Sequence, residues 1–132
     1  INARNINDWW TLRNYDPPKK ISKLADSASF TDHARDIFYL ADPELDSKQD
    51  FSSNCPVTEH TLVFGCYSNG KIYILNVTQD ELEGIEEVTA AHEMLHAVYA
   101  RLDESTINWL DDKLSQQLKQ IKDKRVLSNI AE

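Results

Sequence analysis

The feature that most constrains the fold of this sequence is a pair of strand-forming runs joined by Asn69-Gly70. Residues 61–67 and 71–77 are rich in β-branched and aromatic side chains, which favour extended backbone. Asn-Gly is the strongest short signal for a two-residue hairpin turn, because both residues tolerate positive φ angles. The sequence therefore predicts an antiparallel hairpin. Either of its strands, at 62–67 or 72–77, is a candidate sheet edge for pairing with an extended peptide.

Helical patterns lie on both sides of this hairpin. Residues 3–14 are predicted to form a helix with Trp9 and Trp10 as core contacts, and a short helix is predicted to begin after Thr31 and to end near Leu40. Residues 19–30 show no clear pattern, and residues 43–56 are predicted to be loop with at most one helical turn. Two long helices are predicted over 85–102 and 104–127. This order predicts an α+β fold with a small antiparallel sheet, in a single domain covering residues 1–132.

Composition and charge narrow the possible partners. The 132 residues, with 41% hydrophobic and 27% charged side chains, suit an ordinary soluble domain. The net charge is −8 and the basic residues are scattered, so we expect no nucleic-acid partner. No apolar run is long enough to span a bilayer, so no membrane contact is expected within this segment. Because the chain begins Ile1-Asn2-Ala3 without a methionine, we interpret it as a piece whose targeting or anchoring segment is not included.

The two cysteines, Cys55 and Cys66, are expected to form a disulfide. Cys66 lies in a predicted strand and Cys55 in the loop that leads to it, so a bond between them would tie the loop to the sheet. The alternative is a pair of reduced, buried thiols. A disulfide favours an extracytoplasmic location, at the cell surface or in a secreted protein.

The segment His92-Glu93-Met94-Leu95-His96 carries the chemistry. Two histidines four positions apart project from one face of a helix, so both imidazoles can reach one Zn²⁺ ion. Glu93 lies about 100° further round the helix. Its carboxylate is therefore placed to act as the general base, taking the proton of a water molecule that the ion activates.

The predicted helix carries an apolar stripe that we expect to face the core. The histidines border this stripe, and Glu93 lies beside the small residues Thr89, Ala97 and Ala100. Such an arrangement is typical of a helix that lines a cleft. The alternative is two half-buried histidines on an amphipathic helix with a solvated Glu93. The stripe comprises Val88, Ala91, Leu95, Val98 and Leu102.

The residues that flank the histidines match the strict form of the motif found in zinc peptidases, and the chain resembles the zincin metallopeptidases. Tyr99 and Leu102 stand where the metzincin extension needs glycine and a further ligand, so the resemblance is to the gluzincin-like branch. The segment 87–97 also resembles a group of bacterial, often membrane-anchored proteins with the same motif. The matching flanks are Thr89, Ala90, Met94, Leu95, Ala97 and Val98.

This resemblance implies a zinc-dependent peptidase that acts on a peptide or protein substrate, with His92 and His96 as metal ligands and Glu93 as the catalytic base. Whether it would act as an endopeptidase or an aminopeptidase stays open. The alternative is a zincin-like cell-surface interaction module with weak or no catalytic activity. An intact Glu93 argues against this alternative, because a purely structural metal site needs no general base.

The third zinc ligand is not fixed by the sequence. Gluzincins take a glutamate from a later helix, and this chain ends 36 residues after His96, so one possibility is a ligand beyond Glu132. If residues 104–127 return antiparallel to the motif helix, Asp111 comes level with His96, and Glu104 is a second candidate. The alternative is that these acids stabilise the start of a helix through its dipole.

Overall fold

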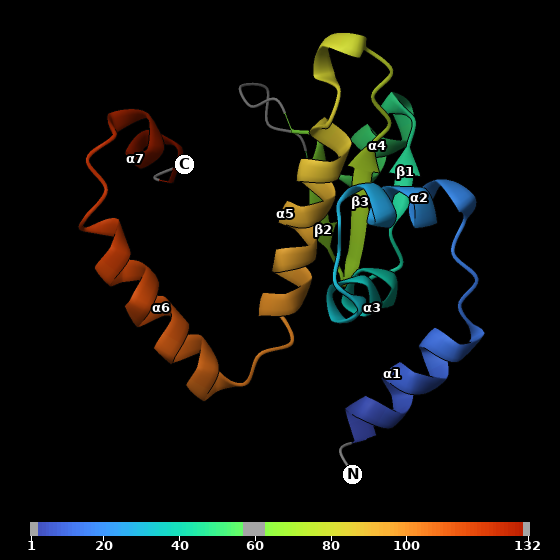
Figure 1. The fold of residues 1–132 in the computed structure, drawn as a ribbon, viewed down its shortest axis with the longest axis horizontal. Coiled ribbons are helices and arrows are strands. Elements are labelled where there is room, and N and C mark those ends of the chain that lie inside the picture. Colours follow the sequence, from blue (N-terminus) through green and yellow to red (C-terminus); the bar gives the residue numbers. More distant parts are fainter. Residues whose placement is uncertain (1–2, 57–62, 131–132) are drawn as a thin grey trace. The chain divides into compact units, whose positions relative to one another are not determined.

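The computed structural model describes residues 3–56 and 63–130, and these form two compact units, Ile1–Ala100 and Arg101–Glu132. Over the described residues, the first unit contains five α-helices, a short 3-10 turn and a sheet, and the second contains two helices (Figure 1). None of the helices in the described ranges is long and apolar enough to cross a bilayer. The elements are α1 (Ala3–Asn14), α2 (Lys19–Ser27), α3 (Asp32–Leu40), β1 (Glu44–Asp46), α4 (Lys48–Asn54), β2 (Gly65–Ser68), β3 (Lys71–Leu75), η1 (Asp80–Leu82), α5 (Ile85–Tyr99), α6 (Glu104–Leu118) and α7 (Lys124–Ile130).

The sheet contains the predicted hairpin. β2 pairs with β3 antiparallel, and the turn between them has φ of 51° at Asn69 and 82° at Gly70. Two successive positive φ angles match the twist of the flanking strands, which is why Asn-Gly favours this turn. The hairpin prediction is confirmed for the described strands, and the predicted start of the first strand at 61–62 lies outside the described residues.

The expectation of a purely antiparallel sheet is wrong, because β1 pairs with β3 in parallel. The strand order is β1-β3-β2, so β3 is central and has neighbours on both sides. β3 therefore cannot be a sheet edge that pairs with a peptide, which excludes the candidate edge at 72–77 over the residues of this strand. An ion-pair cluster supports the parallel pairing: Lys71 Nζ lies 2.8 Å from Asp42 Oδ2 and 2.6 Å from Glu44 Oε1.

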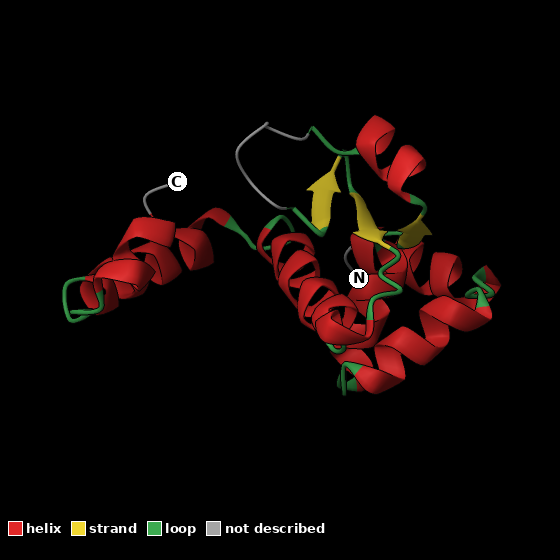
Figure 2. Ribbon diagram, turned by 90° about the horizontal axis from the view of Figure 1, so that it is seen from above, coloured by secondary structure: helices red, strands yellow, loops and turns green. Residues whose placement is uncertain are grey.

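Helices cover both faces of the sheet. In Figure 2 the three strands separate α4 from α2, α3 and α5. The main core lies on the side of α5, where Ile72 and Ile74 of β3 are fully buried against this helix. α4 buries Phe51 and Cys55, which lie outside that core cluster. The core consists of Ile21, Leu24, Ala25, Ile37, Phe38, Ala41, Ile72, Ile74, Ala90, Met94 and Ala97.

The face of α5 that meets the sheet differs from the predicted stripe. Val88 and Leu95 are 66% and 61% exposed, whereas Ala90, Met94 and Ala97 are buried. The reason is that α5 is apolar on most of its circumference, so periodicity alone does not select one face. The small residues allow the helix to approach the sheet closely.

The N-terminal half contains both correct and wrong predictions. The helix at 3–14 is confirmed, but Trp9 and Trp10 are 55% and 62% exposed and are not core contacts. Thr31 caps α3 as predicted, accepting a hydrogen bond from the Ala34 N–H at 3.2 Å. The predicted loop at 43–56 is instead β1 and α4. Ser47 caps α4, because its hydroxyl oxygen accepts a hydrogen bond from the Asp50 N–H.

The second unit contains two helices where one was predicted. Asp103 caps α6 by accepting from the Thr106 N–H at 2.9 Å, so the predicted start is correct. The helix then ends at Leu118, and α7 begins at Lys124. Asp123 accepts a hydrogen bond from the Arg125 N–H at 2.9 Å, and such local side-chain bonds compete with a continuous helix.

The predicted disulfide between Cys55 and Cys66 is present, with Cα atoms 6.0 Å apart. In β2, Cys66 lies between Gly65 and Tyr67, and alternate side chains of a strand point to opposite faces. The bond therefore joins β2 to the end of α4, on the opposite face of the sheet from α5.

We expect the Cys55→Ser/Cys66→Ser double variant to lose about 3 kcal/mol of unfolding free energy, from a disulfide that closes a loop with a sequence separation of 11. Urea unfolding of both proteins measures this loss, and wild-type protein with reductant should match the variant. Thiol counting in denaturant without reductant provides the control. Two free thiols in protein taken from its native compartment would contradict the bond.

Candidate metal centre

α5 carries both histidines of the motif. Gly84 precedes the helix in the left-handed region, with φ of 86°, and Glu86 and Glu87 occupy the first turn, where acidic side chains favour the helix dipole. His92 and His96 lie one turn apart in the second half of the helix, and both are exposed. The imidazoles are therefore accessible from solvent, as ligands of an exchangeable ion need to be.

The two imidazoles face each other with their Nε2 atoms 3.2 Å apart. Zn–N bonds of about 2.0–2.1 Å at a tetrahedral angle place two ligand nitrogens roughly 3.3–3.4 Å apart. The observed separation thus fits one Zn²⁺ ion between the rings with little rearrangement. Their ring planes are inclined by 71°, so the two rings approach this point from different directions.

Glu93 lies between the helix and the hairpin, and only 6% of its surface is exposed. Burial raises the pKa of its carboxyl group, while the nearby His92 and His96 and a backbone hydrogen bond from Tyr67 oppose this shift. A carboxylate that is held in place and partly desolvated is a stronger proton acceptor than a solvated one. The prediction that Glu93 lies beside small residues is confirmed for Thr89 and Ala97, which are buried, whereas Ala100 is exposed just after the end of α5.

The hydrogen bonding of β2 explains the contact with Glu93. The Leu75 N–H donates to the Phe64 carbonyl oxygen at 2.8 Å, just before β2. In an antiparallel pair, residues alternate between bonding to the partner strand and pointing away from it. The backbone groups of Gly65 and Tyr67 therefore point away from β3, and the Tyr67 amide bonds to Glu93.

The described residues bring together His92, Glu93 and His96 but add no further ligand. Within 3–56 and 63–130, no group of three His, Cys, Asp or Glu side chains could hold a metal ion. The candidate third ligands Asp111 and Glu104 lie in α6, in the second unit. The third ligand thus stays a prediction.

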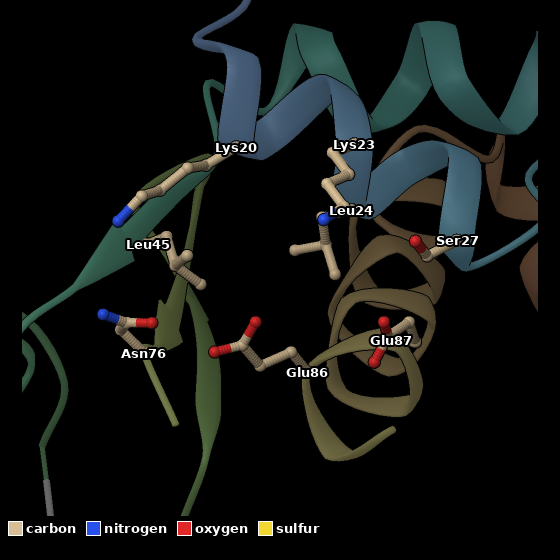
Figure 3. Close-up of a pocket in the computed structure, with 8 residues that line it drawn as sticks. All are labelled: Lys20, Lys23, Leu24, Ser27, Leu45, Asn76, Glu86 and Glu87. Carbon is tan, nitrogen blue, oxygen red and sulfur yellow. The ribbon is translucent and has the colours of Figure 1, made fainter. Parts of the chain in front are cut away.

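A cavity of about 240 Å³ lies elsewhere, at the first turn of α5. Figure 3 shows Glu86 and Leu45 projecting into the space beneath α2. Glu86 Oε1 accepts a hydrogen bond from the Val77 N–H at 2.6 Å, so this carboxylate already joins α5 to the segment after β3. None of the motif residues lines the cavity, and we do not assign it to the metal centre.

Gly65 and Tyr67 were missed as site residues by sequence reasoning. One signal was available, because an isolated glycine within a strand often marks a close approach of another segment. Tyr67 contacts Glu93 through its backbone amide, so the identity of residue 67 does not reveal this contact.

Comparisons of the chain with protein-family models, curated protein sequences and solved structures gave no match. The likeness to zincins therefore rests on the motif and its flanking residues.

Proposed function

We propose that this chain is a zinc-dependent peptidase in which His92 and His96 hold the ion and Glu93 is the general base. The observation that carries this proposal is the pair of Nε2 atoms 3.2 Å apart beside a buried carboxylate on the same helix. The flanks of the motif, from Thr89 to Val98, add the resemblance to zincins. The disulfide supports an extracytoplasmic location.

When bound, Zn²⁺ would polarise the scissile carbonyl and lower the pKa of a water molecule. The protein supplies the proton transfers. Glu93 takes a proton from the water as its oxygen attacks the carbonyl carbon, and passes it to the amine nitrogen as the C–N bond breaks. The Tyr67 amide holds the Glu93 carboxylate on the side of α5 that faces β2.

The geometry favours β2 as the substrate-binding edge. β3 is paired on both sides, whereas β2 is paired only with β3 in the described part of the chain. The backbone groups of Gly65 point toward this unpaired edge, and because Gly65 is buried, pairing with an extended peptide requires that they first become accessible. A substrate along β2 would lie beside Glu93. We therefore propose peptides or unfolded protein segments in extended conformation as the substrates.

Removal of zinc is expected to abolish peptide hydrolysis, and addition of one equivalent of Zn²⁺ to restore it, because the metal activates both the water and the carbonyl. A peptide library incubated with chelator-treated and zinc-loaded protein, and analysed by mass spectrometry, measures this effect. The positions of the cuts also distinguish an endopeptidase from an aminopeptidase.

Tight zinc binding without cleavage of any peptide in the library would contradict the peptidase proposal. That result would favour the alternative, a zincin-like interaction module. Absence of zinc binding would contradict the peptidase proposal, whereas an inactive interaction module could do without the metal. Magnesium in place of zinc serves as the control for a nonspecific divalent effect.

A further inference from the structure

Gly65 of β2 makes the closest approach between the hairpin and α5. A Cβ atom at this position would lie 2.4 Å from Thr89 Cγ2, 3.0 Å from Glu93 Cγ and 3.1 Å from Glu93 Oε1. Carbon atoms in contact are normally about 3.5–4.0 Å apart, and the β-branched Thr89 side chain is stiff about χ1. We therefore expect an added Cβ to push the strand and the helix apart by roughly 1 Å. The absence of a side chain at residue 65 is therefore what lets β2 lie directly against Thr89 and Glu93.

Space, and not backbone conformation, is what requires glycine at residue 65. The described glycines with positive φ are Gly70 and Gly84, so the backbone of Gly65 can accommodate an alanine. Two positions further along the same strand, the Tyr67 amide donates its hydrogen bond to Glu93. A displacement of β2 would lengthen this bond.

We infer that Gly65 is a positioning residue, which keeps β2 close enough to α5 for the Tyr67 amide to hold the Glu93 carboxylate. The catalytic consequence rests on the proposed function. The positioning itself is a property of the fold and can be measured without catalysis. His92 and His96 are exposed on α5 and are not among the closest contacts of Gly65, so their affinity for zinc should not depend on it.

The test compares Gly65→Ala with two double variants. In Gly65→Ala/Thr89→Ala, removal of Cγ2 relieves the 2.4 Å contact and leaves the flexible Glu93 side chain to move by a few tenths of an ångström. In Gly65→Ala/Thr89→Val, a methyl group remains at the position of Cγ2, so the clash persists. The single variants Thr89→Ala and Thr89→Val show what residue 89 contributes by itself.

The first measurement is hydrogen exchange of the Tyr67 amide by NMR. Loss of a hydrogen bond to a charged group should speed exchange about 10- to 100-fold in Gly65→Ala. The alanine double variant should recover most of the protection, and the valine double variant should not. Unchanged protection in Gly65→Ala, or equal recovery by both double variants, would overturn the inference.

The second measurement is kinetic. Misplacement of the base by roughly 1 Å is expected to lower kcat about 100-fold. Zinc affinity should change by less than about 2-fold, because the substitution leaves the geometry of the two histidine ligands unchanged. If wild-type protein hydrolyses no peptide, the proposed function fails, and the amide exchange alone decides the positioning. If Gly65→Ala does not fold, the double variant Gly65→Ala/Thr89→Ala tests the positioning in its place. Failure of that variant to protect the Tyr67 amide from exchange would overturn the inference.

Discussion

Glu93→Gln is expected to lower the rate of peptide hydrolysis by about 10²- to 10⁴-fold while zinc binding is retained. Glutamine keeps the size of the side chain and an oxygen that can accept the Tyr67 hydrogen bond, but it cannot take a proton from water. Because burial raises the pKa of Glu93, the neutral amide is easier to bury than the carboxylate, so thermal stability should not fall. Initial rates on a cleaved peptide, zinc titration and thermal unfolding measure the three effects.

Glu87→Gln is the matched control for this substitution. Glu87 lies in the first turn of the same helix and lines the separate cavity, away from the histidine pair. The Glu87→Gln variant should hydrolyse peptide at the wild-type rate. Equal rates in Glu93→Gln and wild type would show that the cleavage does not use this carboxylate and would remove the mechanistic part of the proposal.

His92→Ala and His96→Ala are each expected to abolish stoichiometric zinc binding. Either change leaves one imidazole and destroys the pair of Nε2 atoms whose 3.2 Å separation fits the ion. Zinc content after gel filtration and a competition titration against a chromophoric chelator measure this loss. His33→Ala removes an exposed histidine from α3 and should bind zinc as wild type does. Stoichiometric zinc in the double variant His92→Ala/His96→Ala would refute the site.

The same titration addresses the third ligand. If Asp111 or Glu104 completes the site, substitution of that residue by alanine should weaken zinc binding by about 10- to 100-fold or more, as loss of supporting metal contacts does. If neither substitution has an effect and binding by the chain is weak, a ligand outside the sequence becomes the favoured explanation. Tight binding that survives both substitutions would require a different ligand within the chain.

The parts of the fold that were predicted correctly depend on local chemistry. The hairpin turn needs positive φ at Asn69 and Gly70, and the cap at Thr31 uses one side chain and an amide three residues on. The spacing of His92 and His96 fixes their common face once the segment is helical. These predictions required no knowledge of which segments meet in three dimensions.

The incorrect parts depend on non-local contacts. β1 has three residues and owes its parallel pairing to β3, which is distant in the sequence, and to the ion pairs of Lys71. The buried face of α5 is selected by the sheet, because small residues there permit an approach that Val88 and Leu95 would prevent. Trp9 and Trp10 show the same limit, since an apolar side chain becomes a core residue only where another element covers it.

The four residues of β2 suggest how distant relatives of this chain could be recognised. Position 65 is restricted by space, and position 66 by its bond to a cysteine 11 residues earlier. Position 67 contacts Glu93 through its backbone, while its side chain packs against the core. We therefore expect relatives that keep this site to share a Gly-Cys pair followed by a residue that can pack against the core, with the cysteine near 26 positions ahead of the first motif histidine, as in this sequence. Where residue 65 has become alanine, residue 89 should have become smaller in the same lineage, so that the two positions covary across the strand–helix contact.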